Sequence, residues 1–100
     1  MMKFDFDKPL KAFTGQEISA SDGPMTLRST ALYAVLSTGV EKLDGLGKYE
    51  RNEFAKRLQE ADEETLFSID DVKKLKDLVG DTPTYGVVLV GAVWDVLEGK

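Results

Sequence analysis

Residues 85–97 read Tyr-Gly-Val-Val-Leu-Val-Gly-Ala-Val-Trp-Asp-Val-Leu, and their conformation determines whether the C-terminal end of the chain is helix or strand. A run so rich in β-branched residues suits a buried strand over 85–91 as well as a helix. The apolar character continues to Leu97 without a turn signal, over more residues than most strands contain, and we therefore favour a helix. Because this segment is apolar almost all round, we expect it to be the central element that the others pack around.

The residues around this segment indicate where its helix begins. Thr82 and Pro83 are of the types preferred at the N-cap and at the first helical position. Gly86 and Gly91 lower the helix propensity by roughly 1 kcal/mol each. We expect a neighbouring backbone to approach closely at both glycines and to offset that cost.

Two further helices are predicted from their caps and their apolar spacing. One begins near Thr26, whose hydroxyl can cap it, and ends at Gly39. The other begins after Ser68, with Asp71 as the acid of a capping box, and ends at Gly80.

A strongly charged helix is predicted from about Lys48 to Ala61. Residues 44–47 contain two glycines and read as a flexible entry to it. Glu53 and Arg57 stand four residues apart, a spacing that favours an ion pair on the helix surface.

The first 24 residues have the character of strands and turns. Residues 3–7 alternate apolar and charged side chains, which is the strand period. Residues 10–13 and 17–18 flank a hairpin turn with Gly15 at the position of positive φ. Residues 19–24 read as a loop.

Together these patterns predict a mostly α (α+β) fold, with about four helices packed around an apolar C-terminal helix and a short N-terminal β-hairpin. We expect a single domain over residues 1–100, with a β-ribbon and loop over 1–24 and a helical core over 25–100. The expected core residues are Leu32, Val35, Leu36, Phe54, Leu58, Val72, Leu75, Val79, Val88, Ala92, Val93 and Trp94.

The chain contains no histidine and no cysteine. It therefore lacks the commonest general base, the thiolate nucleophile and the two best zinc ligands. Asp5-Phe6-Asp7 starts like a calcium loop, but Pro9 and Leu10 stand where further oxygen ligands and a glycine are needed. We expect neither an enzyme nor a protein with a metal or cofactor.

The net charge is −5, and residues 51–100 carry 11 acidic against 7 basic side chains. This charge disfavours direct binding to nucleic acid or to an anionic membrane and permits a protein partner with a basic surface. The alternative, which we favour for the charge taken by itself, is that it serves only solubility. The N-terminal residues turn acidic where the apolar core of a signal peptide would begin, and we expect a cytoplasmic protein.

The densest acidic run lies between the second and third predicted helices. It reads as a solvated surface, with a binding patch and catalytic carboxylates as the alternatives. If the run is a protein-binding patch, acidic residues of the third predicted helix extend it. The candidate binding residues are then Glu60, Asp62, Glu63, Glu64, Asp70, Asp71 and Asp77.

Aromatic residues are the other candidates for partner contacts, because they dominate interface hot spots. Each of three such residues either contacts a partner or lies in the core: Tyr33, Tyr85 and Trp94. For Trp94 we favour the core. Three phenylalanines of the N-terminal ribbon lie either in the core, which we favour, or against a partner's sheet edge: Phe4, Phe6 and Phe13.

The layout of the whole chain resembles small proteins encoded in phage and prophage genomes. The residues that carry the resemblance are Lys3–Phe6, Thr14–Ile18, Met25–Leu27, Tyr49–Arg51, Ser68–Val72 with Leu75, and Tyr85–Trp94 with Leu97. The resemblance implies one of two roles. The first is an anti-CRISPR inhibitor that binds Cas proteins of a host surveillance complex and covers their basic DNA-binding surface. The second is a head or tail morphogenesis accessory, or an assembly chaperone, that acts through the phenylalanine ribbon.

Overall fold

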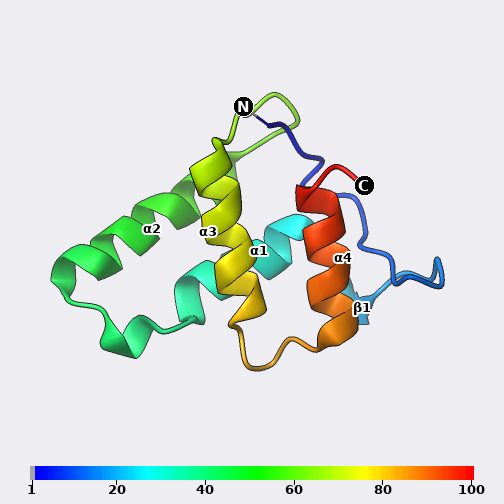
Figure 1. The fold of residues 1–100 in the computed structure, drawn as a ribbon, viewed down its shortest axis with the longest axis horizontal. Helices are drawn as coiled ribbons and strands as arrows, with labels where there is room; N and C mark the ends of the chain where they lie inside the picture. Colours follow the sequence, from blue (N-terminus) through cyan, green and yellow to red (C-terminus); the bar gives the residue numbers. More distant parts are fainter. Residues whose placement is uncertain (1) are drawn as a thin grey trace.

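The computed structural model describes residues 2–100, and within them it contains four α-helices (Figure 1). They are α1 (Leu27–Ser37), α2 (Gly45–Glu60), α3 (Ile69–Gly80) and α4 (Val87–Leu97), with a short 3-10 helix, η1 (Val40–Lys42), between α1 and α2. The strands β1 (Ser19–Ala20) and β2 (Gly23–Pro24) form an antiparallel hairpin, in which Ser19 pairs with Pro24 and Ala20 with Gly23. The expected mostly α fold with a small N-terminal β part is confirmed.

Local capping chemistry sets the starts of α1 and α3. The Thr26 hydroxyl accepts a hydrogen bond from the backbone of Ser29, whose side chain accepts one from the Thr26 backbone. Ser68 and Asp71 form the same reciprocal capping box at α3, as predicted. Gly39 follows α1 with a φ of 67°, a left-handed conformation that glycine adopts without strain and that ends the helix.

The start of α2 differs from the prediction. The Asp44 carboxylate accepts a hydrogen bond from the backbone of Gly47 (2.7 Å) and caps the helix. Residues 44–47 are therefore the N-cap and first turn rather than a flexible entry, and α2 begins at Gly45 instead of near Lys48.

The C-terminal segment is a helix and not a strand, but it begins later than Thr82-Pro83. Thr82 lies in the turn before it, where its hydroxyl donates to the carbonyl of Leu78 (2.7 Å) and shares a buried hydrogen bond with the Thr38 hydroxyl (2.6 Å). That hydroxyl holds the end of α3 against the end of α1. The N-cap of α4 is Gly86, which has no side chain to cap it, and Val87 is the first helical residue.

The central helix is α1, not α4. It contacts all three other helices, whereas α4 lies against α3 and α1 on one side of the bundle (Figure 1). Thr30, Ala31 and Ala34 are fully buried on α1, and their small side chains let neighbouring helices approach. Within residues 2–100, no other segment approaches Gly86 or Gly91, and a Cβ on either would meet no atom of another segment within 4 Å.

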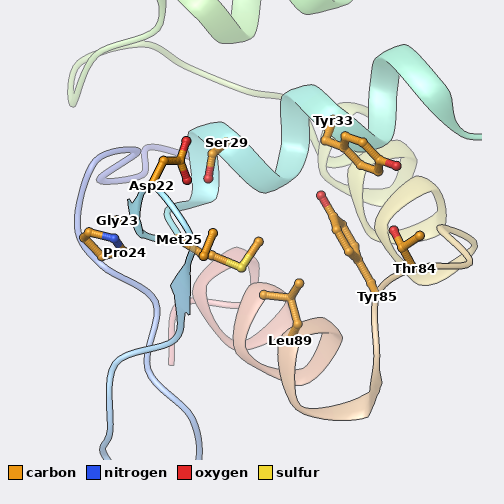
Figure 2. Close-up of a pocket in the computed structure, with 10 residues that line it drawn as sticks. Asp22, Gly23, Pro24, Met25, Ser29, Tyr33, Thr84, Tyr85 and Leu89 are labelled. Atoms are coloured by element: carbon orange, nitrogen blue, oxygen red, sulfur yellow. The ribbon is translucent and has the colours of Figure 1, made fainter.

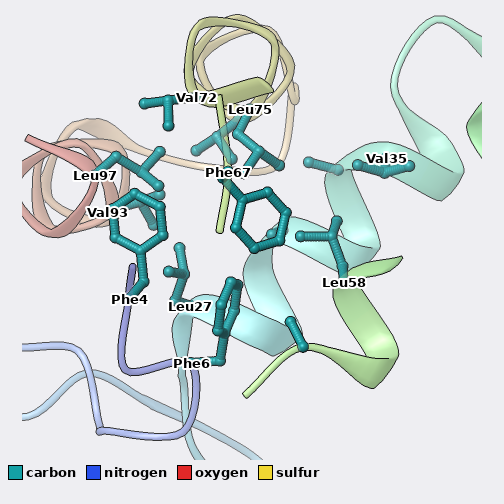
Figure 3. Packing of buried hydrophobic residues seen from close by; sticks show 14 of the residues in the cluster. Phe4, Phe6, Leu27, Val35, Leu58, Phe67, Val72, Leu75, Val93 and Leu97 are labelled. Atoms are coloured by element: carbon teal, nitrogen blue, oxygen red, sulfur yellow. The ribbon is translucent and has the colours of Figure 1, made fainter. Parts of the chain in front are cut away.

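The core is built around three aromatic rings. Phe67 lies 5.5 Å from Phe6 and 6.2 Å from Phe4 between ring centroids, and helices α1 to α4 supply the aliphatic side chains around them (Figure 3). Eight of the predicted core residues are buried: Val35, Phe54, Leu58, Val72, Leu75, Val79, Ala92 and Val93. Leu32 is half-buried against this cluster.

Three predicted core residues are exposed instead. Leu36 is 55% exposed, Val88 44% and Trp94 37%. Val88 and Trp94 lie on parts of α4 that its contacts with α3 and α1 leave open to solvent, and Leu36 lies on the exposed side of α1. The Trp94 ring lies along the bundle surface, where its Nε1 donates to the Lys76 carbonyl of α3 (3.2 Å).

The predicted strand over residues 3–7 forms no ladder, but its alternation is correct. Phe4 and Phe6 are buried, whereas Asp5 and Asp7 are exposed. The only strand-like pairing in this part of the described chain is a bridge between Met2 and Phe67 that joins the N-terminus to the start of α3. An extended chain with alternating burial does not need a strand partner when its inner face packs on helices.

The hairpin predicted around Gly15 is present as a bridge between Lys11 and Glu17, and Gly15 has the expected positive φ of 87°. Residues 19–24, expected to be a loop, form the β1–β2 hairpin. Phe13 is 91% exposed at the first turn and is not a core residue.

None of the helices between residues 2 and 100 combines the length and the apolar content that a membrane crossing requires.

Candidate binding surfaces

Arg28 on α1 joins three segments of the chain. Its guanidinium donates to carbonyl oxygens at the C-terminal end of α2: those of Leu58 (2.6 Å), Gln59 (2.9 Å) and Ala61 (2.7 Å). Carbonyl groups at such a position have no partner within their own helix. Arg28 also pairs with the Asp7 carboxylate, and these hydrogen bonds hold the pKa of Asp7 below its ordinary value. One side chain thus fixes the N-terminal segment and the end of α2 on α1.

Two tight turns present carboxylates next to Arg28. Asp5 accepts hydrogen bonds from the backbone of Asp7 (3.2 Å) and Lys8 (3.1 Å). In the turn after α2, Asp62 accepts hydrogen bonds from the backbone of Glu64 (2.9 Å) and from the hydroxyl of Thr65 (3.1 Å). These bonds lower the pKa of Asp62, so its carboxylate is charged at neutral pH.

The two turns meet around a hollow of about 420 Å³, which we call the acidic hollow. In Figure 1 the loop after α2 and the N-terminal segment lie together at the same end of the molecule. The lining residues are Asp5, Phe6, Asp7, Arg28, Asp62, Glu63 and Glu64. Five carboxylates therefore line the hollow beside one guanidinium. Asp7 pairs with that guanidinium and Glu64 pairs with Lys3 (3.0 Å), and the remaining three carboxylates make the field in the hollow negative.

The acidic hollow contains only three of the seven predicted site residues, Asp62, Glu63 and Glu64. The notable additions are Asp5 and Asp7, which sequence reasoning assigned only to the polar face of a strand. Their alternation with buried phenylalanines indicated correctly that they point outward. Nothing local indicated that they meet residues 62–64, because that contact joins segments more than fifty positions apart.

Asp71 links α3 to α2 and caps α3. Its carboxylate pairs with Arg57 of α2 (2.9 Å) and accepts from the backbone of Ser68 (3.2 Å). The Arg57 hydrogen bonds are the main reason that the pKa of Asp71 lies below its ordinary value. Arg57 is consequently not paired with Glu53, which binds Lys56 instead (3.0 Å).

The remaining predicted acids are exposed but dispersed. Glu60 is the last residue of α2 and lies outside the lining of the hollow. Asp70 and Asp77 share the outward side of α3 with Lys73 and Lys74, which fall between them at helical spacing. This alternation of charges gives α3 no uniformly negative face.

The carboxylates of the hollow are not arranged as a metal centre. Across residues 2–100, no group of three or more acidic side chains is placed to hold a metal ion. The arrangement can nevertheless attract and orient cationic groups, because hydrogen bonds hold Asp5, Asp7 and Asp62 in place before a partner arrives.

A second hollow, of about 530 Å³, lies between the β1–β2 hairpin, α1 and the start of α4 (Figure 2). We call it the tyrosine hollow, because Tyr33 and Tyr85 form one of its walls with ring centroids 5.8 Å apart. The Tyr85 hydroxyl donates to the carbonyl of Thr30 (2.8 Å), which fixes its ring. Burial, followed by the proximity of Tyr33, raises the pKa of Tyr85 to about 12. These rings thus face a pocket and not the core centre.

Comparison with known proteins gives no assignment. The chain matches no family model, and no curated protein or solved structure matches it.

Proposed function

We propose that this chain is a non-enzymatic binding protein that places its acidic hollow on a basic surface of a larger protein. The observation that supports this is the convergence of carboxylates from residues 5–7 and 62–64 around one hollow. Charges gathered in this way steer a basic partner during encounter and fix its orientation. Hydrogen bonds within the two turns already hold Asp5 and Asp62, which reduces the entropy lost on binding.

The first partner to test is a CRISPR–Cas surveillance complex, with this chain acting as an anti-CRISPR-like inhibitor. The resemblance to small phage-encoded proteins suggests this class of partner. The negative field suggests the surface, because the Cas proteins that hold target DNA present lysines and arginines to its phosphates. We expect this interaction to take place in the cytoplasm of the host cell.

Two double variants with the same change in charge test which acidic surface binds. Glu63→Lys with Glu64→Lys reverses the charge at the acidic hollow, whereas Asp70→Lys with Asp77→Lys reverses it on α3. We expect the first pair to abolish binding to a guide-RNA-loaded complex and the second to weaken it only slightly. Equal losses from both pairs would show that net charge matters rather than the hollow.

Affinity capture identifies the partner. The native protein and the Glu63→Lys, Glu64→Lys variant serve as matched baits in lysate from a phage host with an active CRISPR system, and mass spectrometry compares the captured proteins. Cas proteins enriched on the native bait, and released at high salt, support the proposal. If the two baits capture the same proteins, the acidic hollow is not the binding site and the proposal fails.

The second candidate function is that of a phage head or tail morphogenesis accessory or assembly chaperone. The observation that favours it is Phe13, whose ring is 91% exposed at the tip of a turn. Phe4 and Phe6 are buried, so Phe13 alone remains of the proposed aromatic ribbon. Capture of phage structural proteins that Phe13→Ser abolishes, and that the charge reversals leave intact, would favour this role.

A further inference from the structure

We infer that the tyrosine hollow receives one arginine side chain of a partner protein. The inference rests on the charge, the wall chemistry and the shape of the hollow. A hollow of about 530 Å³ is within the range of sites that take small ligands or single side chains.

Charge determines the sign of the occupant. Among the described residues that line the hollow, Asp22 is the one carboxylate, and none is a lysine or an arginine. None of the ion pairs formed among residues 2–100 involves Asp22. The hollow therefore presents one negative charge that no described lysine or arginine pairs with, and it suits a cation.

The walls favour a cation with a long apolar stem. Figure 2 shows Asp22 beside Ser29 at one side of the hollow, Tyr33 and Tyr85 at the other, and Met25 and Leu89 between them. An extended side chain can place its charged end at Asp22 and its methylene groups along Met25 and Leu89. Arginine has this shape, and its planar guanidinium can also bind a carboxylate at two points.

Arginine suits this hollow better than lysine does. The guanidinium is less strongly hydrated than an ammonium group and can bind the Asp22 carboxylate at two points, so it loses less on entering the hollow. The tyrosine rings, at the other side of the hollow, contact the apolar part of the side chain. Lysine offers a point charge that binds the carboxylate at one point only. The order of affinity, arginine above lysine, is therefore a property of the site.

This inference does not depend on the proposed function. The tyrosine hollow and the acidic hollow share no lining residue. A partner with a basic surface could use both, but each is tested by variants that leave the other intact, so failure of one is distinguishable from failure of the other.

The experiment is a titration of the isotope-labelled protein with N-acetyl-arginine-amide, followed by amide and methyl NMR shifts, with N-acetyl-lysine-amide as the comparison. We expect saturable shifts at Met25, Ser29 and Leu89, an affinity in about the millimolar range for so small a probe, and weaker binding of lysine. Asp22→Asn should weaken arginine binding roughly threefold, because asparagine keeps the turn chemistry but removes the charge.

Three further variants complete the test. Tyr33→Ser should weaken binding by roughly threefold through loss of the ring that contacts the apolar part of the side chain, whereas Tyr33→Phe keeps that ring and should not change binding. Glu63→Gln in the acidic hollow should also leave it unchanged. Shifts confined to the acidic hollow, equal affinity for lysine, or full binding by Asp22→Asn would each overturn the inference, provided that the variant keeps the native amide spectrum.

Discussion

The Arg28 guanidinium and the Asp7 carboxylate meet at two points, with Nε 2.9 Å from Oδ1 and Nη2 3.1 Å from Oδ2. Arg28 simultaneously holds the carbonyl groups at the end of α2. The N-terminal segment and the loop after α2 are therefore aligned by the same side chain, and the acidic hollow forms where they meet. The site is a consequence of how the fold satisfies the end of a helix.

Loss of the Arg28 side chain should destabilise the protein more than loss of the Asp7 charge. Arg28→Ala leaves three carbonyl oxygens at the end of α2 without their donor, and we expect the free energy of unfolding to fall by roughly 2–3 kcal/mol. Asp7→Asn removes only one exposed partner and should cost clearly less. Urea denaturation followed by circular dichroism measures both.

Arg28→Lys is the control for this comparison. Lysine keeps the positive charge but cannot reach several carbonyl groups and a carboxylate together. We expect a loss of stability close to that of Arg28→Ala. A lysine variant as stable as the native protein would mean that charge alone, and not the geometry of the guanidinium, holds the segments together.

The ion pair between Arg57 and Asp71 should contribute stability only where Asp71 is ionised. The pKa of Asp71 in the folded state lies below its ordinary value of 3.8, so the contribution is present above that value and is lost as the pH falls through the folded-state pKa. Asp71→Asn should therefore lower the free energy of unfolding at pH 7 by about 1 kcal/mol or less. The difference from the native protein should shrink as the pH falls below 3.8 and vanish once the pH is below the folded-state pKa.

Urea denaturation of the native protein and of Asp71→Asn between pH 2 and pH 7 gives the two stability curves. The asparagine side chain of this variant retains an oxygen that can accept from Ser68, so the comparison isolates the ion pair rather than the cap. A difference that stays constant over this pH range would mean that the carboxylate charge plays no part.

Trp94 should contribute less to stability than its size suggests. Its ring lies on the bundle surface, 37% exposed, with Lys76 5.3 Å above it. Trp94→Ala should cost about 1–2 kcal/mol, below the roughly 3–5 kcal/mol expected of a fully buried aromatic. Leu75→Ala, at a fully buried position on α3, should cost roughly 3–4 kcal/mol. Chemical denaturation would contradict this order if Trp94→Ala proved the more damaging.

The features that could be predicted from the sequence depend on neighbours in the chain. Thr26 and Ser68 cap helices through contacts three residues away, and Gly39 ends α1 through its own φ. The alternation at Phe4 and Phe6 predicts burial for the same reason, since the strand period is a local property. Such signals need no knowledge of the tertiary structure.

The features that could not be predicted depend on the packing of distant segments. The sequence of an apolar helix such as α4 does not show which side of the helix packs against a neighbour. It therefore could not show that Val88 and Trp94 are exposed rather than in the core. The centre of the bundle is instead α1, which owes that place to the small buried residues Thr30 and Ala34. The acidic hollow joins Asp5 to Glu63, and no pattern in a single sequence links the two.

The Tyr85 phenol should make the protein sensitive to alkali. Burial raises its pKa to about 12, above the ordinary value of 10.0, so folding favours the neutral phenol. The resulting stability is fully present below pH 10 and is lost as the pH rises through 12. Tyr85→Phe lacks this dependence, and it also lacks the hydrogen bond to Thr30, which should cost about 1 kcal/mol at pH 7.

Ultraviolet absorbance measures this directly, because a phenolate absorbs where a phenol does not. The native protein should show a tyrosine that ionises near pH 12, and Tyr85→Phe should lack that late component. Tyr33→Phe serves as the control, because it keeps Tyr85 and its bond to Thr30 and should retain the late component. A native protein without a tyrosine that ionises near pH 12 would contradict the prediction, because the Tyr85 ring would then not be held in the wall of the tyrosine hollow.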